Sequence, residues 1–363
     1  MVITVLLLIG LGLVIIYSAT FRDEGFAAVR RQMFAFFVGL LLSFGLLNID
    51  YKRFCTFRIS LSRRSAVGIQ LSYVIYLAAV FLLVLVMKKG QSALGAQRWI
   101  RLGPFGTFEP SEFAKLAVLL ALATYFSERK SPLEWKSIAG ALVLTGVPLL
   151  LVLVQPDLGT SIVLAGILFM LLFYLGVNWM LLSGSVLAAG AAVLKIMKPY
   201  QRERLLVFLH PKRDPTGSGW NILQSLIAVG SGRFSGKGLL AGTQTQLKFV
   251  PEHSTDFIFT VIAEELGFIG SAAVLFLYGL ILWVGSRIVF ETEDPLGKLL
   301  AVGIVTMLFV HVFINIGMTV GVMPITGIPL PFISAGGSSL ITNMLAIAFL
   351  LNIESRRGRL ISA

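Results

Sequence analysis

Long apolar runs, separated by short polar stretches, dominate the pattern of the chain. Runs of about 17–25 apolar residues have the length that a helix needs to cross the hydrocarbon core of a bilayer. Several connections between the runs, such as "LVQPDLGT", are so short that neighbouring helices are expected to be antiparallel in a compact bundle. We therefore predict an all-α integral membrane protein with a single polytopic domain, residues 1–363. The ten predicted membrane-spanning helices cover residues 2–20, 32–47, 71–87, 111–127, 137–154, 157–176, 178–196, 257–290, 297–321 and 338–353.

One long connection, residues 197–256, separates the seventh predicted helix from the eighth. A connection of this length in a compact fold is usually either functional or disordered. Its apolar pieces "LLVFLH" and "WNILQSLIAV" argue against disorder and predict short helices on the bundle or at the lipid interface. Its "GSGRFSGKG" stretch fails as a phosphate-binding loop, because Gly238 follows Lys237 where that motif requires Ser or Thr. The stretch is interpreted as a flexible connection.

Composition agrees with a membrane protein. Hydrophobic residues make up 56% of the chain and charged residues 13%, whereas a soluble domain carries about 25% charged residues. The mean hydropathy is +0.88. The net charge of +12 lies mainly in the loops, so it indicates membrane topology and affinity for anionic lipids rather than binding of nucleic acid. The single cysteine, Cys55, excludes an internal disulfide and a cysteine-based metal site.

Loop charges predict the orientation of the chain. The loops at 48–70, 128–136 and 286–298 and the C-terminus together hold thirteen Lys and Arg residues, whereas the short loops of the opposite side hold seven. The richer side is normally cytoplasmic. Both termini are therefore predicted to be cytoplasmic, and the 197–256 loop extracytoplasmic. The first run has no basic start and no small-residue cleavage site, so it is interpreted as a retained span rather than a signal peptide.

Acidic residues gather where the eighth predicted helix begins, in "VPEHSTDFIFTVIAEELG". Asp256 at this position, like Ser254 or Thr255, would suit a helix N-cap. Alternatively, a partly desolvated carboxylate at the rim of a polar cavity has a pKa that suits a general base. Glu264 lies eight residues further, near the same helical face, where it would either tune Asp256 or serve the packing of the helix.

Two other polar clusters precede predicted helices. In "QRWIRLGPFGTFEPSEFAKLA", Glu112 and Lys115 have the i, i+3 spacing of a helical ion pair, which is either structural or presents cations with Arg98 and Arg101 to an anion. In "QPDLGT", Asp157 would cap the following helix or hold a cation or a substrate hydroxyl.

The stretch "MPITGIPLPFISAGGSS" combines prolines and glycines with apolar residues. Irregular backbone at membrane depth is tolerated only inside protein or along a cavity, so a re-entrant segment is predicted. Its "SAGGSS" end begins the last helix, where backbone N–H groups would suit an anion. His311 and Asn315, one turn apart, are typical of an interhelical hydrogen-bonding pair, and the three histidines are too dispersed for a zinc site.

Seven motifs resemble, in their order and over nearly the whole chain, the SEDS family (shape, elongation, division and sporulation). Among SEDS proteins the short N-terminus resembles the RodA branch more than the FtsW branch. The motifs are "RRQMFAF", "GAQRWIRLGPFGTFEPSEFAKLA", "QPDLGTS", "RERLLVFLHP", "GWNILQSLIAVGSG", "GTQTQLKFVPEHSTDFIFTVIAEELGFIG" and "GIPLPFISAGGSS".

The resemblance implies a peptidoglycan glycosyltransferase of the bacterial cytoplasmic (inner) membrane. Such an enzyme polymerises lipid II into glycan strands on the outer face during cell elongation and shape maintenance, beside a class B penicillin-binding transpeptidase. Asp256 matches the family's catalytic aspartate. The motifs and the long loop also supply the candidate substrate-binding residues Arg31, Arg98, Arg101, Glu112, Lys115, Asp157, Arg202, Gln224, Lys248 and Ser338.

We expect Asp256 to deprotonate a sugar hydroxyl of the acceptor, which displaces pyrophosphate from the donor with inversion. Arg and Lys groups, with or without a divalent cation such as Mg or Mn held by carboxylates, would stabilise the leaving charge. No metal ligand is assigned. The alternative function is a lipid II flippase, because polar residues inside a bundle and broken helices also suit a transporter.

Overall fold

The computed structural model describes residues 1–60, 68–93, 96–101, 107–129, 133–196, 207–208 and 218–357. Contacts along the chain divide it into two compact units. Unit 1 contains Met1–Met33, Asn178–Ile281 and Val310–Gly336, and unit 2 contains Phe34–Val177, Leu282–Phe309 and Gly337–Ala363.

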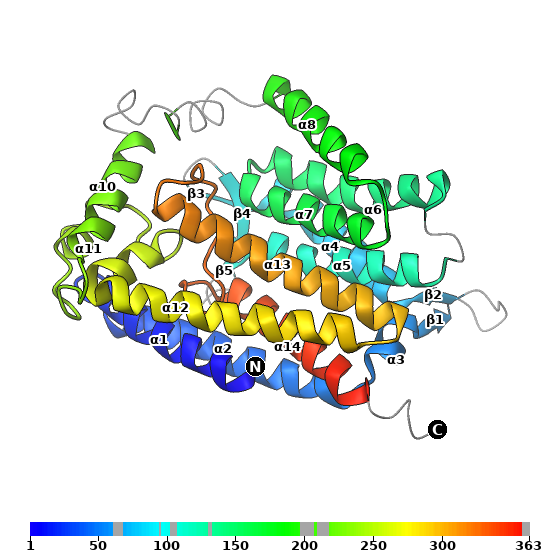
Figure 1. Cartoon of the computed structure of the whole chain (residues 1–363), viewed down its shortest axis with the longest axis horizontal. Coiled ribbons are helices and arrows are strands. Elements are labelled where there is room, and N and C mark those ends of the chain that lie inside the picture. Colours follow the sequence, from blue (N-terminus) through cyan, green and yellow to red (C-terminus); the bar gives the residue numbers. More distant parts are fainter. Residues whose placement is uncertain are drawn as a thin grey trace. The chain divides into compact units, whose positions relative to one another are not determined.

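Each of the ten predicted spans coincides with a helix (Figure 1), so the predicted helical membrane fold is confirmed. Seven of the described helices are long and apolar enough to cross a membrane, namely α1, α2, α4, α6, α12, α13 and α14, and α7 is a shorter apolar helix. The helices are α1 (Val2–Thr20), α2 (Phe26–Asn48), α3 (Tyr51–Thr56), α4 (Leu71–Lys89), α5 (Pro110–Ser127), α6 (Trp135–Val154), α7 (Leu158–Tyr174), α8 (Trp179–Ile196), α10 (Ser218–Ser231), α11 (Thr243–Gln246), α12 (Ile258–Glu291), α13 (Pro295–Thr319) and α14 (Gly337–Arg357).

Two small antiparallel sheets were not predicted from the sequence. In the first, β1 (Arg58–Ser60) pairs with β2 (Gly68–Gln70); in the second, β4 (Ala96–Arg101) lies between β3 (Gln91–Ala93) and β5 (Thr107–Phe108). Strands of two to six residues are too short to show a clear alternation of apolar and polar positions. Strand β4 of the second sheet carries Arg98 and Arg101, two of the candidate residues from the sequence.

Helix α5 forms the centre of unit 2. It contacts α4, α6, α7 and α14, and fifteen of its eighteen residues are buried. A helix that is buried on nearly all sides belongs to the core rather than to the lipid-facing surface. Its charged residues, Glu112 and Lys115, are therefore carried into the interior of the unit.

Helix α12 in unit 1 is broken at Gly267, where φ is 65° and ψ is −158°. The break lies nine residues after Ile258, about 14 Å along the helix. Residues 232–246, named the insert here, lie against this break. Within the insert, the backbone N–H groups of Lys237 and Gly238 donate to the carbonyls of Glu264 and Glu265, both at 3.0 Å.

The hydrogen bonds also run in the opposite direction. The N–H groups of Phe268 and Ile269, just after the break, donate to the carbonyls of Arg233 at 2.9 Å and Phe234 at 3.2 Å. Backbone groups that a helix break leaves without intrahelical partners must find others in a membrane protein. The insert supplies them.

Gly232 and Gly236 of the insert serve close packing, so the expected flexible connection is replaced by a tightly fitted one. A Cβ at Gly232 would lie 1.8 Å from the carbonyl oxygen of Ala263, and one at Gly236 would lie 2.1 Å from that of Glu265. Only glycine allows two backbones to approach this closely.

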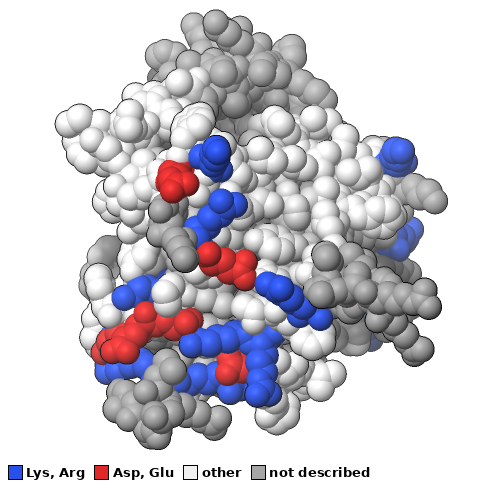
Figure 2. All heavy atoms as spheres, turned by 90° about the vertical axis from the view of Figure 1, so that its right-hand side faces the viewer, with Lys and Arg blue, Asp and Glu red and all other residues white. Residues whose placement is uncertain are grey.

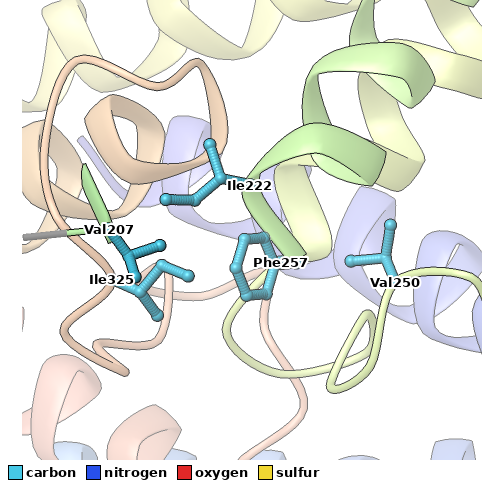
Figure 3. Packing of buried hydrophobic residues seen from close by; sticks show 5 residues of the cluster. All are labelled: Val207, Ile222, Val250, Phe257 and Ile325. Carbon is cyan, nitrogen blue, oxygen red and sulfur yellow. The ribbon is translucent and has the colours of Figure 1, made fainter. Parts of the chain in front are cut away.

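The remainder of the long loop packs through apolar residues. Helix α10 contributes Ile222, which lies with Val207, Val250, Phe257 and Ile325 in one buried cluster (Figure 3). Ser225 of α10 also donates a hydrogen bond to the carbonyl of Thr319 at 2.6 Å. The prediction that "WNILQSLIAV" forms a helix packed on the bundle is therefore confirmed; of "LLVFLH", only Val207 and Phe208 lie among the described residues.

Helix ends in unit 2 are joined by ion pairs around a cavity of about 440 Å³. Lys52 pairs with Asp294 at 3.0 Å, Arg356 lies 3.7 Å from Asp50, and Arg357 pairs with Glu291. Acidic and basic side chains accordingly alternate on the face seen in Figure 2. Arg356 and Arg357 also lie in the last turn of α14, where their positive charges interact favourably with the negative end of the helix dipole.

Candidate functional site

Asp256 lies two residues before α12, in a turn of unit 1, and is partly buried. The side-chain amide of Asn315 donates to the backbone carbonyl of Asp256 at 2.8 Å and to that of Ile328 at 2.6 Å. One amide therefore joins the turn to the segment 320–336. Asn315 was expected to bond a neighbouring helix, and these two partners are instead backbone carbonyls outside regular helices.

The segment 320–336 is irregular and largely buried, which confirms the predicted non-helical backbone inside the protein. Side chains satisfy part of its backbone. The Gln32 amide donates to the carbonyl of Ser334 and accepts from the N–H of Gly336, both at 3.0 Å, and Tyr278 donates to the carbonyl of Pro331. Irregular backbone away from water needs such partners.

This segment also contacts the Asp256 turn directly. The Ser334 hydroxyl donates to the carbonyl of Thr255 at 2.6 Å, and the N–H of Ala335 donates to the carbonyl of Ser254 at 2.9 Å. Gly327 has a φ of 72°, and a Cβ at this position would lie 3.2 Å from Oδ2 of Asp256. The carboxylate therefore faces a position where the backbone carries no side chain.

His253 fixes the same turn to α1. One ring nitrogen contacts the carbonyl of Val250 at 3.0 Å and the other contacts the carbonyl of Ala19 at 2.9 Å. The position of Asp256 is thus set from three directions, by α1, by α13 through Asn315, and by the segment 320–336.

The cationic candidates of unit 1 are exposed and paired with acids. Lys248 forms an ion pair with Asp23, and Arg31 forms one with Glu24. Exposed pairs contribute little to stability and exchange partners readily, so both cations are available to an anionic ligand. Gln224 is buried on α10, and Arg202 lies outside the described residues.

The second set of candidates lies in unit 2. Nζ of Lys115 lies 2.7 Å from Oε1 of Glu112, and the exposed fractions of these residues are 1% and 3%. The i, i+3 ion pair predicted from the sequence is therefore present and buried. Oε2 of Glu112 is also buried and has no hydrogen-bond partner among the residues that the structure describes.

Arg98 and Asp157 form a second pair in unit 2. Nη1 of Arg98 lies 3.6 Å from Oδ1 of Asp157, and Nε donates to the carbonyl of Gln155 at 3.1 Å. Asp157 also accepts a hydrogen bond from the N–H of Thr160 at 3.0 Å, so the predicted N-cap of α7 is confirmed. Arg101, at the end of β4, is exposed.

Glu109 belongs to the same set and was missed by the sequence analysis. Its backbone N–H donates to the hydroxyl of Ser338, and its carboxylate accepts from the hydroxyl of Ser111, both at 3.0 Å. Burial, with the negative charges of Glu112 and Asp157, raises the pKa of Glu109 to about 8. Its position just before Pro110, where a helix begins, was the available signal in the sequence.

Replacing Glu109 with glutamine is expected to change how stability depends on pH. Because the pKa is raised from 4.5 to about 8, the folded protein keeps a proton that the unfolded chain loses. The free energy of unfolding of the wild type should fall relative to that of Glu109→Gln as the pH rises from about 5 to about 8. Above about pH 8 the difference between the two proteins should stay constant. Thermal unfolding in detergent across this pH range measures the difference as a shift in Tm. A difference of 1 kcal/mol in the free energy of unfolding corresponds to about 2–4 °C in Tm. Glu134→Gln, at an exposed carboxylate, is the control; equal pH dependence of wild type and Glu109→Gln would contradict the prediction.

A metal site was left open by the sequence. In the part of the chain that the structure describes, no group of three or more His, Cys, Asp or Glu side chains is arranged to hold a metal ion. No ligand set can be assigned among these residues.

Comparison with known proteins gives consistent results. A family model described as a cell cycle protein family, FtsW/RodA/SpoVE, matches residues 1–358. The chain is 43% identical over 290 residues to the peptidoglycan glycosyltransferase MrdB of Escherichia coli K12, which covers 79% of this chain and 78% of MrdB. The fold is similar, at a TM-score of 0.80 and 33% identity over 98% of this chain and 97% of the other, to a chain solved in a peptidoglycan synthase complex that coordinates polymerization and crosslinking. It is also similar to the rod shape determining protein RodA of Thermus thermophilus, at a TM-score of 0.71 and 30% identity over 98% and 96% of the chains.

Proposed function

The chain belongs to the FtsW/RodA/SpoVE family and is a multi-pass membrane peptidoglycan glycosyltransferase, and on that premise we propose that Asp256 is its general base. The proposal depends on the environment of the Asp256 carboxylate. It is partly buried, its turn is held by Asn315 and His253, and Oδ2 faces the bare backbone of Gly327. A carboxylate that is held in place, and that no side chain at position 327 crowds, suits a general base.

The reaction assigned to Asp256 is glycosyl transfer between lipid-linked sugars. Asp256 takes the proton of the acceptor's sugar hydroxyl while that oxygen forms a bond to the anomeric carbon of the donor. The bond between this carbon and the pyrophosphate oxygen breaks, and the electron pair leaves with the lipid pyrophosphate. Attack opposite the leaving group inverts the anomeric configuration.

The leaving pyrophosphate requires positive charge. In unit 1, which holds Asp256, the described candidates that can supply it are Arg31 and Lys248. Arg98, Arg101 and Lys115 of unit 2 stay predictions from the sequence. Guanidinium groups suit this role because their planar fork binds phosphate oxygens in pairs. Ser338 and Gln224 are assigned as neutral hydrogen-bonding groups for the substrate, and Asp157 as the acid that orients Arg98.

The substrate proposed is lipid II, and the product is the growing glycan strand on the outer face of the bacterial cytoplasmic membrane. Both termini would then be cytoplasmic, as the loop charges indicate. The proposed partner is a class B penicillin-binding transpeptidase, in keeping with the similarity to a chain from a peptidoglycan synthase complex. The similarity to MrdB and RodA supports a role in elongation and cell shape.

The test of this function measures two products of the reaction. Purified protein, with its transpeptidase partner blocked by a β-lactam, is incubated with labelled lipid II, and glycan polymer and released undecaprenyl pyrophosphate are both measured. We expect one pyrophosphate for each glycosidic bond formed, and neither product from a folded Asp256→Ala variant. Equal polymer from wild type and variant would remove Asp256 from the reaction, whereas transbilayer movement of lipid II without pyrophosphate release would favour a flippase.

A further inference from the structure

Glu264, on the first part of α12, is the most completely paired carboxylate in the described chain. It is 0% exposed and accepts hydrogen bonds from one side of the insert. The donors are Nζ of Lys237 at 2.8 Å, the hydroxyl of Thr243 at 3.2 Å, the N–H of Gln244 at 2.9 Å, and the N–H and hydroxyl of Thr245 at 3.1 and 2.9 Å. Of the two roles considered for Glu264, these bonds favour packing over a direct effect on Asp256.

The neighbouring Glu265 connects the same insert to α1. Its carboxylate accepts from the hydroxyl of Ser18 at 2.6 and 2.7 Å, and that hydroxyl accepts from the N–H of Leu240 at 3.1 Å. The amide of Gln246 donates to the carbonyl of Ser18 at 2.9 Å. Two successive acids of α12 therefore hold the insert on two sides.

The insert ends at Gln246, ten residues before Asp256. Gln246 and His253, which lies three residues before Asp256, both bond the same part of α1. Gln246 bonds the carbonyl of Ser18, and His253 contacts the carbonyl of Ala19, the next residue. The interval between them has little freedom to move independently of the insert. A displacement of the insert would consequently be transmitted to the turn that holds Asp256.

We propose that Lys237 and Glu264 are a positioning pair, which holds the insert as a fixed brace and thereby sets the location of the Asp256 carboxylate. The proposal rests on Asp256 being the base. In this role Lys237 contacts neither the substrate nor the reacting atoms. Its ammonium compensates a buried negative charge, and Glu264 in turn orders residues 243–245 through four hydrogen bonds.

A fixed brace is favoured over a moving gate by the backbone contacts. The glycines at 232, 236 and 267 bring the insert and α12 too close for either to shift alone, and four backbone hydrogen bonds join them across the break. Opening the insert would expose these groups and the Glu264 charge together. Preorganised geometry of this kind is what transition-state placement requires.

Kinetics of Lys237 variants test the positioning role. Lys237→Met should lower kcat for lipid II polymerisation about 10²-fold, with KM changed less than about threefold, because misplacing a catalytic group by about 1 Å has effects of this size. Lys237→Arg, which restores the charge, should recover most of kcat. Arg287→Gln is the matched control, since Arg287 pairs with Glu291 on the same helix but is exposed, and it should match wild type.

If Lys237→Met does not fold, Thr245→Val replaces it. This change removes one hydrogen bond to Glu264 and leaves the ion pair, and it should lower kcat about tenfold with unchanged KM. Wild-type kcat in Lys237→Met, or in Thr245→Val where that variant replaces it, would overturn the positioning role. Asp256→Ala is measured beside them: an active Asp256→Ala enzyme refutes the base, whereas an inactive one beside a wild-type-like Lys237→Met refutes only the brace.

Cross-linking tests whether the brace is fixed. The rings of Phe234 in the insert and Phe268 after the break are stacked, with centroids 5.9 Å apart, and both are exposed. The paired variant Phe234→Cys/Phe268→Cys can be joined by a short bis-thiol linker, and the native Cys55 is buried. A fixed brace predicts a cross-linked enzyme within about twofold of its own activity before cross-linking. Loss of activity on cross-linking, restored on cleaving the linker, would show that the insert moves and would overturn the proposal.

Discussion

An Asp256→Asn enzyme is expected to bind its lipid substrate as wild type does and to turn it over about 10²–10⁴-fold more slowly, the usual contribution of a general base. Asparagine keeps the size of the side chain and one acceptor oxygen. The bond from Asn315 goes to the backbone carbonyl of residue 256, so the turn should keep its position. Initial rates of polymer formation over a range of lipid II concentrations separate kcat from KM.

The matched control for this variant lies in the same turn. Glu252 is an exposed acid whose carboxylate accepts a hydrogen bond from the hydroxyl of Thr255 at 3.1 Å. Glu252→Gln removes one negative charge near Asp256 without touching the proposed base, and kcat should stay within about twofold of wild type. A loss confined to KM in Asp256→Asn would instead assign this carboxylate to substrate binding.

Local sequence patterns were sufficient for the parts of the fold that depend on neighbours along the chain. Apolar run length located the ten helices, because crossing a bilayer demands a fixed number of residues. The i, i+3 spacing gave the Glu112–Lys115 pair, and "PDLGT" gave the Asp157 cap. Each of these features is complete within one turn of helix or one run of residues.

The insert could not be predicted, because every interaction that defines it joins distant parts of the chain. Lys237 meets Glu264 twenty-seven residues further on, and Leu240 meets Ser18, 222 residues earlier in the chain. The glycines of "GSGRFSGKG" resemble a loose connection when read locally, whereas two of them, Gly232 and Gly236, allow close contact with α12. Glu109 was missed for a related reason: its raised pKa comes from burial beside Glu112 and Asp157, and burial is not a local property.

The break in α12 bears on the rival transporter function. Discontinuous helices in transporters leave backbone groups free to bind substrate or coupling ions. At Gly267, two carbonyls before the break and two N–H groups after it are hydrogen-bonded by the insert, and Glu264 is paired as well. The polar groups in this part of α12 are therefore used to hold structure, which fits a rigid scaffold for surface chemistry better than a transport path.

Replacing Lys115 with methionine should cause the largest loss of stability among the site residues. The change leaves Glu112, only 3% exposed, without its counter-charge in the centre of unit 2. Removing one partner of a buried ion pair costs about 3–5 kcal/mol, because the remaining charge stays desolvated. Thermal unfolding of purified protein in detergent measures the effect. Lys298→Met is the control, since Lys298 is a cation of α13 in the same unit that is only partly buried, and its Tm should stay close to that of wild type.

The double variant Glu112→Gln/Lys115→Met separates the structural role of this pair from a role in binding pyrophosphate. Removing the second charge cancels the desolvation cost, so the double variant should be more stable than Lys115→Met alone. If the ammonium of Lys115 also stabilises the leaving pyrophosphate, the folded double variant should have a kcat/KM about 10²-fold or more below that of wild type. Loss of one charge-stabilising donor has an effect of this size. Recovery of both Tm and activity would show that the pair serves folding only, and the pyrophosphate cations would then have to be sought among Arg31, Arg98, Arg101 and Lys248.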